Sequence, residues 1–459
     1  MKFGGTSVQD AEAVSRVVQV VAGERRARLV VVSALARVTD ALLEVARLAE
    51  RGEAAAAREA VRALRLRHEA ITTLVRQPER RAELLKALDA LFAEVEAVAT
   101  ALAVVREVSP RSCDALVAAG ELASSRIVAA ALAEGGLPSR WLDARELLVT
   151  DAAHGAATPD RAATDERLRA RVSPPLQEGL VAVTGGFVGA SAGGVTTTLG
   201  RGGSDYSAAL FGAGLAAEEI QIWTDVDGML TADPRLVPTP RVVSRLSFAE
   251  ASELAYFGAK VLHPSTILPA AFLGIPVRIL NSHRPRAEGT LITAASAPGI
   301  PGPVAIACRR GVTRIDITST RMLMAYGFLR RVFEVFERFE TPVDVVTTSE
   351  VSVSVTIDDR HAIEGIVAEL RVFADVACET GMAILSAVGE GLRRDARLAA
   401  QVIGALEGLP LAMVSQGGSR TNVTVVLPEA DAVTAMLRLH RRFFEPEAAA
   451  AESQALATA

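Results

Sequence analysis

Residues 199–207 read LGRGGSDYS, and this glycine-dense stretch indicates the fold of the chain around it. Three threonines, 196–198, come just before it, and an apolar helical pattern follows. Glycine-rich junctions between a strand and a helix are where α/β folds bind ligands. The guanidinium of Arg201, enclosed by glycines, is suited to pairing with a carboxylate or a phosphate. The alternative is a glycine-rich turn with a solvated arginine.

Short apolar runs on both sides of this stretch have the length and composition of buried strands. They are residues 29–34, 179–183 and 277–281, together with a strand and turn over 220–233. Helical patterns separate them, so we expect an α/β fold, an open sheet with helices on both faces. Residues 41–110 are rich in alanine and arginine and predict a helical insert.

A segment rich in proline and glycine, residues 294–303, marks a boundary after a first domain over 1–297. The pattern beyond it, strand, helix, two strands and helix, occurs twice, which predicts two ferredoxin-like α+β modules. We place the first at 304–388 and the second at 389–445, with a strand from 304–310 as an alternative completion of the second. Residues 446–459 are alanine-rich and are expected to be disordered.

Charge and cysteine usage narrow the class of protein. The 49 basic residues include only three lysines, Lys2, Lys86 and Lys260, so a lysine that remains is a candidate for chemistry. The net charge of −5 argues against a nucleic-acid or membrane-surface binder. Three widely spaced cysteines suit neither a disulfide framework nor a zinc site, and no apolar run reaches the roughly 20 residues of a membrane span. We therefore expect a cytoplasmic protein that binds small molecules.

Residues 2–7 read KFGGTS and predict a very short strand, a glycine pair and the start of a helix. Such a turn offers free backbone N–H groups and a helix dipole to an anion, and Lys2 could reach the same phosphate. By itself, this segment is more typical of an ordinary strand, turn and helix than of a phosphate site. It is not a Walker loop, because no Gly-x4-Gly-Lys-Ser/Thr pattern occurs.

Two further segments carry candidate polar residues. Residues 223–235, WTDVDGMLTADPR, place three acids, a glycine and an arginine after a strand, either as simple turns or as one edge of a nucleotide pocket. Glu121 begins an otherwise apolar helix, where it is either a partner of the helix dipole or a group that binds a substrate ammonium.

Taken together, these motifs resemble those of aspartate kinases. The resemblance runs from Met1 to about Phe444 and rests on KFGGTS at 2–7, VVSA at 31–34, VTD at 38–40, GEL at 120–122, GRGGSDY at 200–206, WTDVDG at 223–228 and FGAKVLHP at 257–264. The two C-terminal modules, with TTSEVSV at 347–353, resemble the ACT regulatory domains of that family, in its lysine-sensitive monofunctional branch. The resemblance implies an amino-acid-kinase fold and ATP-dependent phosphorylation of the β-carboxylate of L-aspartate. That reaction is the first step of lysine, threonine and methionine biosynthesis.

The resemblance also assigns roles to individual residues. It implies catalytic roles for Lys2 and Asp205. It implies that aspartate is bound by Thr39, Glu121, Arg201, Gly202, Gly203 and Ser204. It implies that the nucleotide is bound by Lys2, Gly4, Gly5, Thr6, Thr224, Asp225, Arg235, Lys260 and Val261. Mg²⁺ would be held mainly by the ATP phosphates, without a metal site built by the protein.

For the C-terminal modules the resemblance implies a homodimer or higher oligomer with an effector amino acid, lysine first, between subunits. The effector residues would be Met322, Phe328, Leu329, Val343, Asp344, Thr348, Ser349 and Glu350. Several positions depart from the family pattern. Leu230 replaces a tyrosine near adenine, Ala36-Arg37 a small residue and glycine, Asp40 an asparagine and Ala325 a serine, and the family has a few more residues before Lys2.

Two other functions fit parts of the same pattern. The chain could be another amino-acid kinase, acting on glutamate, acetylglutamate or UMP, although those lack the FGAKVLHP element and the tandem modules. It could also be a catalytically inactive amino-acid sensor, because ACT modules bind ligands without chemistry. The retention of Lys2, Arg201, Asp205 and Lys260 argues against the sensor.

Overall fold

The computed structural model describes residues 1–258, 264–296, 302–319, 326–358 and 362–445. The chain divides into two compact units. One comprises Met1–Met229 and Leu262–Ala294, and the other comprises Leu230–Val261 and Ala295–Ala459. The second unit thus includes a segment that precedes the end of the first in sequence. The domain limits inferred from the sequence stay a prediction.

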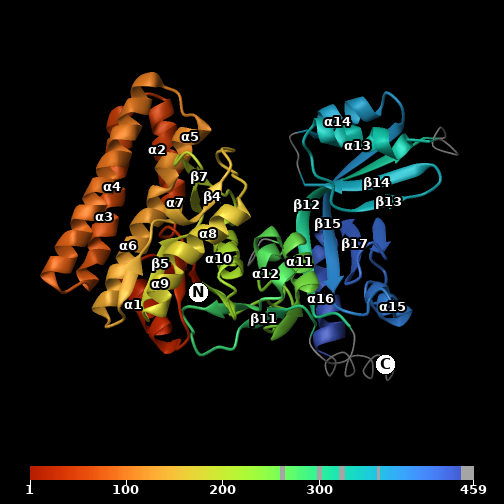
Figure 1. Ribbon diagram of the computed structural model, residues 1–459. Helices are drawn as coiled ribbons and strands as arrows, with labels where there is room; N and C mark the ends of the chain where they lie inside the picture. Colours follow the sequence, from red (N-terminus) through yellow and green to blue (C-terminus); the bar gives the residue numbers. More distant parts are fainter. Residues whose placement is uncertain (259–263, 297–301, 320–325, 359–361, 446–459) are drawn as a thin grey trace. The chain divides into compact units, whose positions relative to one another are not determined.

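The first unit alternates helices with short strands (Figure 1). Its strands are β1 (Lys2–Phe3), β2 (Leu29–Val32), β3 (Ser139–Trp141), β4 (Val149–Thr150), β5 (Val181–Gly185), β6 (Val188–Ser191), β7 (Thr196–Thr198), β8 (Ile220–Thr224), β10 (Val277–Asn281) and β11 (Thr290–Thr293). Its helices are η1 (Gly5–Val8), α1 (Ala11–Gly23), α2 (Val38–Glu50), α3 (Ala54–Ile71), η2 (Thr72–Leu74), α4 (Pro78–Val105), α5 (Pro110–Val117), α6 (Ala119–Glu134), α7 (Ala144–Leu147), α8 (Arg161–Arg171), α9 (Ser173–Gln177), α10 (Gly203–Gly214), η3 (Pro264–Ile267) and α12 (Leu268–Leu273).

The main sheet of this unit runs in the order β3-β5-β2-β1-β8-β10-β11. All neighbouring pairs are parallel except β10 with β11. The two-residue strand β1 is central, with Lys2 opposite Val31 of β2 and Ile222 of β8. In a parallel sheet the carboxyl ends of all strands meet at one edge. The loops after β2, β1, β5 and β8 therefore meet there.

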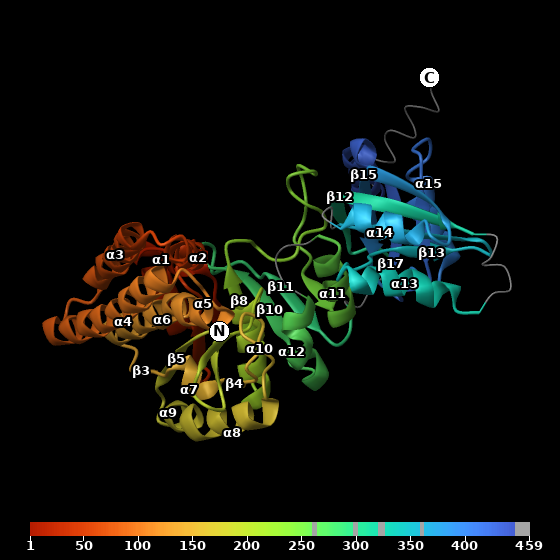
Figure 2. The same cartoon turned by 90° about the horizontal axis from the view of Figure 1, so that it is seen from above.

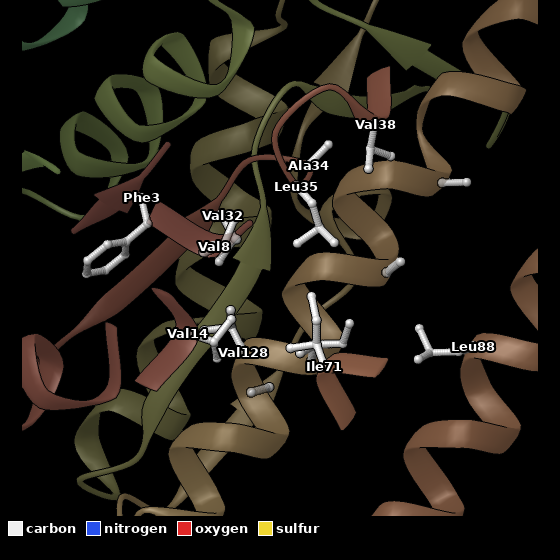
Figure 3. Packing of buried hydrophobic residues seen from close by; sticks show 14 of the residues in the cluster. Phe3, Val8, Val14, Val32, Ala34, Leu35, Val38, Ile71, Leu88 and Val128 are labelled. Carbon is white, nitrogen blue, oxygen red and sulfur yellow. The ribbon is translucent and has the colours of Figure 1, made fainter. Parts of the chain in front are cut away.

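The long helices α3 and α4 lie side by side in both views (Figure 1, Figure 2). The apolar faces of α3 and α4 pack into the core of this unit. Figure 3 shows part of that core, a single cluster that includes Phe3, Leu35, Val38, Ile71 and Leu88. Because α2 contributes Val38 to this cluster, the loop that precedes α2 is tied to the helical insert as well as to the sheet.

Among the residues that the structure describes, one stretch is long and apolar enough to span a bilayer, Pro110–Glu134 of the first unit. It comprises α5 and α6, and 83% of its most apolar window is buried inside the protein. Burial of that extent is typical of a core helix.

The second unit contains a six-stranded sheet in the order β13-β14-β12-β15-β17-β16. Its elements are β9 (Arg245–Ser247), α11 (Phe248–Tyr256), β12 (Ala305–Thr318), α13 (Phe328–Arg338), β13 (Val346–Thr348), β14 (Ser352–Ile357), α14 (Ile363–Leu370), β15 (Asp375–Val388), α15 (Ala396–Gly404), β16 (Met413–Gln416), β17 (Asn422–Pro428), η5 (Glu429–Asp431) and α16 (Ala432–Phe444). The helices α13 and α14 cover one half of the sheet in a cluster of their own, and α15 and α16 cover the other half.

The strands β12 and β15 each run through both halves of this sheet. A register shift between Arg310 and Arg314 changes which residues of β12 are buried, from Ile306 before the shift to Ile315 and Ile317 after it. An extra residue in a strand reverses the alternation of faces. The shift therefore lets apolar residues of one strand serve the helix pairs of both halves.

Candidate functional site

An ion pair lies where the central strand of the first unit ends. The Nζ of Lys2 is 2.7 Å from Oδ1 of Asp205, and the two side chains are only 10% and 17% exposed. Asp205 lies in the first turn of α10, where the helix dipole stabilises a carboxylate. The fold thus brings together two charged residues about 200 positions apart in the sequence.

The loop before α10 depends on its glycines. Gly200 and Gly202 have φ angles of 73° and 74°, a conformation that is costly for other residues. A Cβ on Gly203 would lie 2.7 Å from the ring of Phe187, so that close approach also requires glycine. Arg201 is exposed on this loop.

A cavity of about 390 Å³ opens around the ion pair. Its lining is Lys2, Gly5, Ser33, Ala34, Leu35, Ala36, Arg37, Thr39, Asp40, Glu121, Phe187, Gly200, Gly202, Gly203, Ser204 and Asp205. Eight residues with predicted site roles are in this set: Lys2, Gly5, Thr39, Glu121, Gly202, Gly203, Ser204 and Asp205. The lining does not include five others from the first unit: Gly4, Thr6, Arg201, Thr224 and Asp225.

Glu121 is the buried acid of this cavity. It is 3% exposed, and its Oε2 has no hydrogen-bond partner within the described residues. Burial raises the pKa of this carboxyl to about 8, and this effect outweighs the opposing hydrogen bonds from the N–H groups of Ala34 and of Glu121 itself and the charge of Lys2. The carboxyl is therefore largely protonated at neutral pH, and a cationic donor placed beside it would favour its ionised form.

The turn after β1 is built for close approach. The N–H of Gly4 donates to the carbonyl of Trp223 at 3.0 Å, which joins this turn to β8. A Cβ on Gly5 would lie 2.9 Å from the carbonyl oxygen of Ala34, so only glycine fits. The N–H groups of Gly5 and Thr6 begin the helix η1, before its first internal hydrogen bonds. They are suitable donors to a phosphate.

The residues assigned to the nucleotide fall into separate groups. Thr224 ends β8, and its hydroxyl donates to Asp225 Oδ1 at 3.2 Å. Arg235 belongs to the second unit, where its guanidinium pairs with Asp233 at 2.5 Å. Leu230 is also in that unit and bridges to Val242. Lys260 and Val261 lie outside the described residues.

A buried acid that the sequence analysis overlooked supports the glycine loop. Asp114 is 2% exposed and accepts from Thr198 Oγ1 at 2.6 Å and from the N–H of Gly155 at 3.1 Å. His154 Nδ1 is 2.8 Å from its other oxygen. Thr198 ends β7, directly before the loop, and Gly155 packs against Gly200. Asp114 therefore fixes both flanks of the loop.

Phe187 and Arg37 were also overlooked as cavity residues. Both have positive φ angles, 63° and 65°, which are unusual for residues other than glycine. For Arg37 the sequence held one signal, because an arginine stands where the family has a glycine. For Phe187 the only signal was the pair of glycines directly before it.

Asp344 is the central residue of the predicted effector set. Its side chain is 3% exposed and pairs with Arg309 Nη1 at 2.6 Å, and Tyr256 Oη donates to it at 2.9 Å. Burial raises the pKa of Asp344, against the charge of Arg309, and burial together with this carboxylate raises the pKa of Tyr256 to about 12. Arg309 also donates to the carbonyl of Tyr256. An effector ammonium at Asp344 would meet a carboxylate that already has a cationic partner.

The other predicted effector residues differ in exposure. Phe328 is buried against Phe373, with ring centroids 5.9 Å apart, and Val343 is half-buried beside the same core cluster. Three polar residues at the end of β13, Thr348, Ser349 and Glu350, are exposed, and Leu329 is 41% exposed. Met322 and Ala325 lie outside the described residues.

An open parallel sheet, a glycine-rich anion loop and a lysine–aspartate pair at its carboxyl edge define a class of kinase. The profile described as "Amino acid kinase family" matches residues 1–281, and that described as "ACT domain" matches residues 385–443. The chain is 39% identical over 453 residues to lysine-sensitive aspartokinase 3 of Escherichia coli, covering 97% of this chain and 98% of that protein. It is 36% identical to chloroplastic aspartokinase 3 of Arabidopsis thaliana, covering 99% and 83%.

Solved structures agree with these relatives. E. coli aspartokinase III in complex with lysine and aspartate (T-state) superposes with a TM-score of 0.81 at 38% identity, covering 96% of this chain and 98% of that one. The same enzyme with aspartate and ADP (R-state) gives 0.81 at 37%, covering 96% and 99%. The chain belongs to the aspartokinases. The predicted enzyme class and the predicted fold, an α/β amino-acid-kinase fold with a C-terminal ACT region, are confirmed.

Proposed function

We propose that this aspartokinase transfers the γ-phosphoryl group of ATP to the β-carboxylate of L-aspartate and forms 4-phospho-L-aspartate in the cytosol. The observation that carries the proposal is the pairing of Lys2 and Asp205 in one cavity with Glu121, a buried acid whose second oxygen has no hydrogen-bond partner among the described residues. Such a cavity offers a cation to a phosphoryl group and an acid to an ammonium. Aspartate and ATP together supply both groups.

The chemistry requires little proton transfer, because the β-carboxylate of aspartate is already ionised at neutral pH. The barrier arises from repulsion between that carboxylate and a triphosphate, and fixed cations in a water-poor site lower it. Lys2 would stabilise the transferred phosphoryl group, and Asp205 would hold the ammonium of Lys2 in place. Glu121 would pair with the ammonium of aspartate, and Arg201 would close onto its α-carboxylate.

The N–H groups of Gly5 and Thr6, at the start of η1, suit the phosphates of ATP, and Thr224 and Asp225 follow the neighbouring strand β8. Among the described residues no three histidine, cysteine or acidic side chains gather as metal ligands. In this proposal Mg²⁺ is held mainly by the phosphates, where it would neutralise part of their charge.

The test is ATP-dependent hydroxamate formation with aspartate, glutamate, acetylglutamate and no acid as separate arms. Product with aspartate above the other acids is expected; equal or greater product with glutamate or acetylglutamate would refute the proposed substrate. Lys2→Ala and Asp205→Ala should abolish transfer while calorimetry still detects aspartate. Normal turnover in either variant would reject the assigned roles, and Lys86→Ala, on the exposed face of α4, is the control.

For regulation, we propose that lysine inhibits the enzyme by binding at the half of the second unit's sheet that α13 and α14 cover. The enzyme would be a homodimer or larger oligomer formed through the ACT region. The acids Asp344 and Glu350 suit a cationic amino acid. Lysine would shift an equilibrium between two states of different affinity for substrate. Unchanged activity across a millimolar lysine titration would reject this regulation. Parallel titrations with threonine and methionine identify the effector.

A further inference from the structure

Arg37 adopts a backbone conformation that is unfavourable for an arginine. With φ 65° and ψ 4° it is left-handed, directly before α2. Residues other than glycine hold such a conformation only when the surrounding structure fixes it, and they cluster at ligand sites. The conformation of Arg37 therefore needs a structural cause, and it makes a role in ligand binding worth testing.

The structural cause is a set of contacts made by its neighbours. The N–H of Ala36 donates to the carbonyl of Gly5 at 3.1 Å, and Arg67 Nη1 donates to the carbonyl of Ala36 at 2.9 Å. On either side, Leu35 and Val38 are buried in the core. These contacts fix the backbone at residue 37 whatever side chain it carries. The side chain of Arg37 is thus not needed for the turn.

The side chain nevertheless lines the cavity of Lys2, Glu121 and Asp205. Arg37 is exposed and forms no ion pair or hydrogen bond through its guanidinium with the described residues. Unlike Lys2, whose charge Asp205 offsets at 2.7 Å, Arg37 has no carboxylate at ion-pair distance among the described residues, although Asp40 lines the same cavity. The start of α2 adds the positive end of a helix dipole beside it. An anionic group of a ligand is the partner that this arrangement favours.

The sheet order indicates which ligand supplies that anion. Arg37 follows β2, on one side of β1, whereas Thr224 and Asp225 follow β8, on the other side. Glu121, proposed to hold an ammonium, lines the cavity together with Lys2 and Gly5, proposed to contact the phosphates, whereas Thr224 and Asp225, proposed for the rest of the nucleotide, do not line it. We infer that Arg37 binds a carboxylate of the amino-acid substrate and does not contact the nucleotide. This inference rests on the proposed function.

The test is steady-state kinetics of Arg37→Gly in the full-length enzyme. Glycine suits the left-handed backbone, so the melting temperature should be no lower than in the parent, and a folding defect cannot explain a loss. The KM for aspartate should rise about tenfold, the size expected of one charge-assisted contact in a half-open site. The KM for ATP should stay within about twofold. Arg37→Lys should lie between parent and Arg37→Gly, because a point charge replaces a planar fork.

The matched control is Arg106→Gly. Arg106 is also exposed and left-handed, with φ 56°, but it ends α4 and does not line the cavity, so its kinetics should equal those of the parent. An unchanged KM for aspartate in Arg37→Gly, or a rise in the KM for ATP instead, would overturn the inference. If the parent prefers a different acidic amino acid, the proposed function fails, and the same variants are measured with that acid.

Discussion

We expect aspartate binding by the parent enzyme to depend on pH through Glu121, and replacing Glu121 by glutamine should remove that dependence. The carboxyl has a pKa of about 8 in the free enzyme because it is buried. If it pairs with the ammonium of aspartate, it must lose its proton when aspartate binds. Binding should therefore strengthen as the pH rises towards 8.

The size of the effect follows from that pKa. About 1% of the carboxyl is ionised at pH 6 and about half at pH 8, so the affinity for aspartate should rise about 50-fold between them if the bound carboxyl stays ionised. Glutamine has nearly the same shape and does not titrate. Glu121→Gln should bind aspartate more weakly at pH 8 and show a nearly flat profile.

The same pKa affects the stability of the free enzyme. Because the folded carboxyl keeps a proton that the unfolded chain releases above its ordinary pKa of 4.5, this group stabilises the folded state most below that pH. The contribution is lost as the pH rises from about 4.5 to 8, by up to about 5 kcal/mol. Over this range the stability of Glu121→Gln should fall less than that of the parent, and saturating aspartate should protect the parent most at the upper end.

Titration calorimetry of aspartate without nucleotide, at about pH 6, 7 and 8, measures the first effect. Repeating each titration in two buffers of different ionisation enthalpy gives the number of protons released when aspartate binds. Glu134→Gln, at the other end of the same helix, is the control and should keep the parent's profile. A parent affinity that is flat with pH, or proton uptake on binding, would refute the pairing of Glu121 with the substrate ammonium.

Three further predictions concern other parts of the molecule. Lys2→Arg should reduce kcat at least about tenfold, because a planar guanidinium cannot replace a compact ammonium beside Asp205, and Lys86→Arg should have no effect; equal kcat values would contradict this. In the parent, the carboxylate of Asp114 accepts from three donors, so Asp114→Asn should lower the free energy of unfolding in urea by about 2–4 kcal/mol and raise the KM for aspartate. A variant with the stability and KM of the parent would count against this role. Asp344→Asn should weaken inhibition in a lysine titration several-fold, whereas an unaltered titration would exclude it as an effector contact.

The parts of the molecule that the sequence predicted well are those with a local pattern. The strand over residues 277–281 was expected from a short apolar run and matches β10. The loop at 199–207 was expected from its glycines, and the structure shows why they are needed, since Gly200 and Gly202 require positive φ angles. Lys2 and Asp205 were both proposed from the resemblance of their motifs to those of aspartate kinases, although their 2.7 Å ion pair depends on the whole sheet.

The parts that the sequence did not reveal depend on contacts between distant segments. Asp114 meets Thr198 across 84 positions and His154 across 40, and neither pair forms a recognisable motif. Asp344 was proposed from the resemblance to the family, but its partner Arg309 on β12 was not foreseen. Such pairs become visible only when the sheet order and its register are known.

The long strands β12 and β15 have a consequence for anyone who wishes to shorten this protein. A chain cut after Val388 would lose β17, the partner of Met382–Val388 on β15. The exposed edge would carry Ile384 and Leu385, which are at most 1% exposed in the intact chain. An unpaired apolar edge of that length promotes aggregation. The two halves of the sheet are therefore inseparable as expression products, and a regulatory fragment must begin before Ala305 and extend through α16.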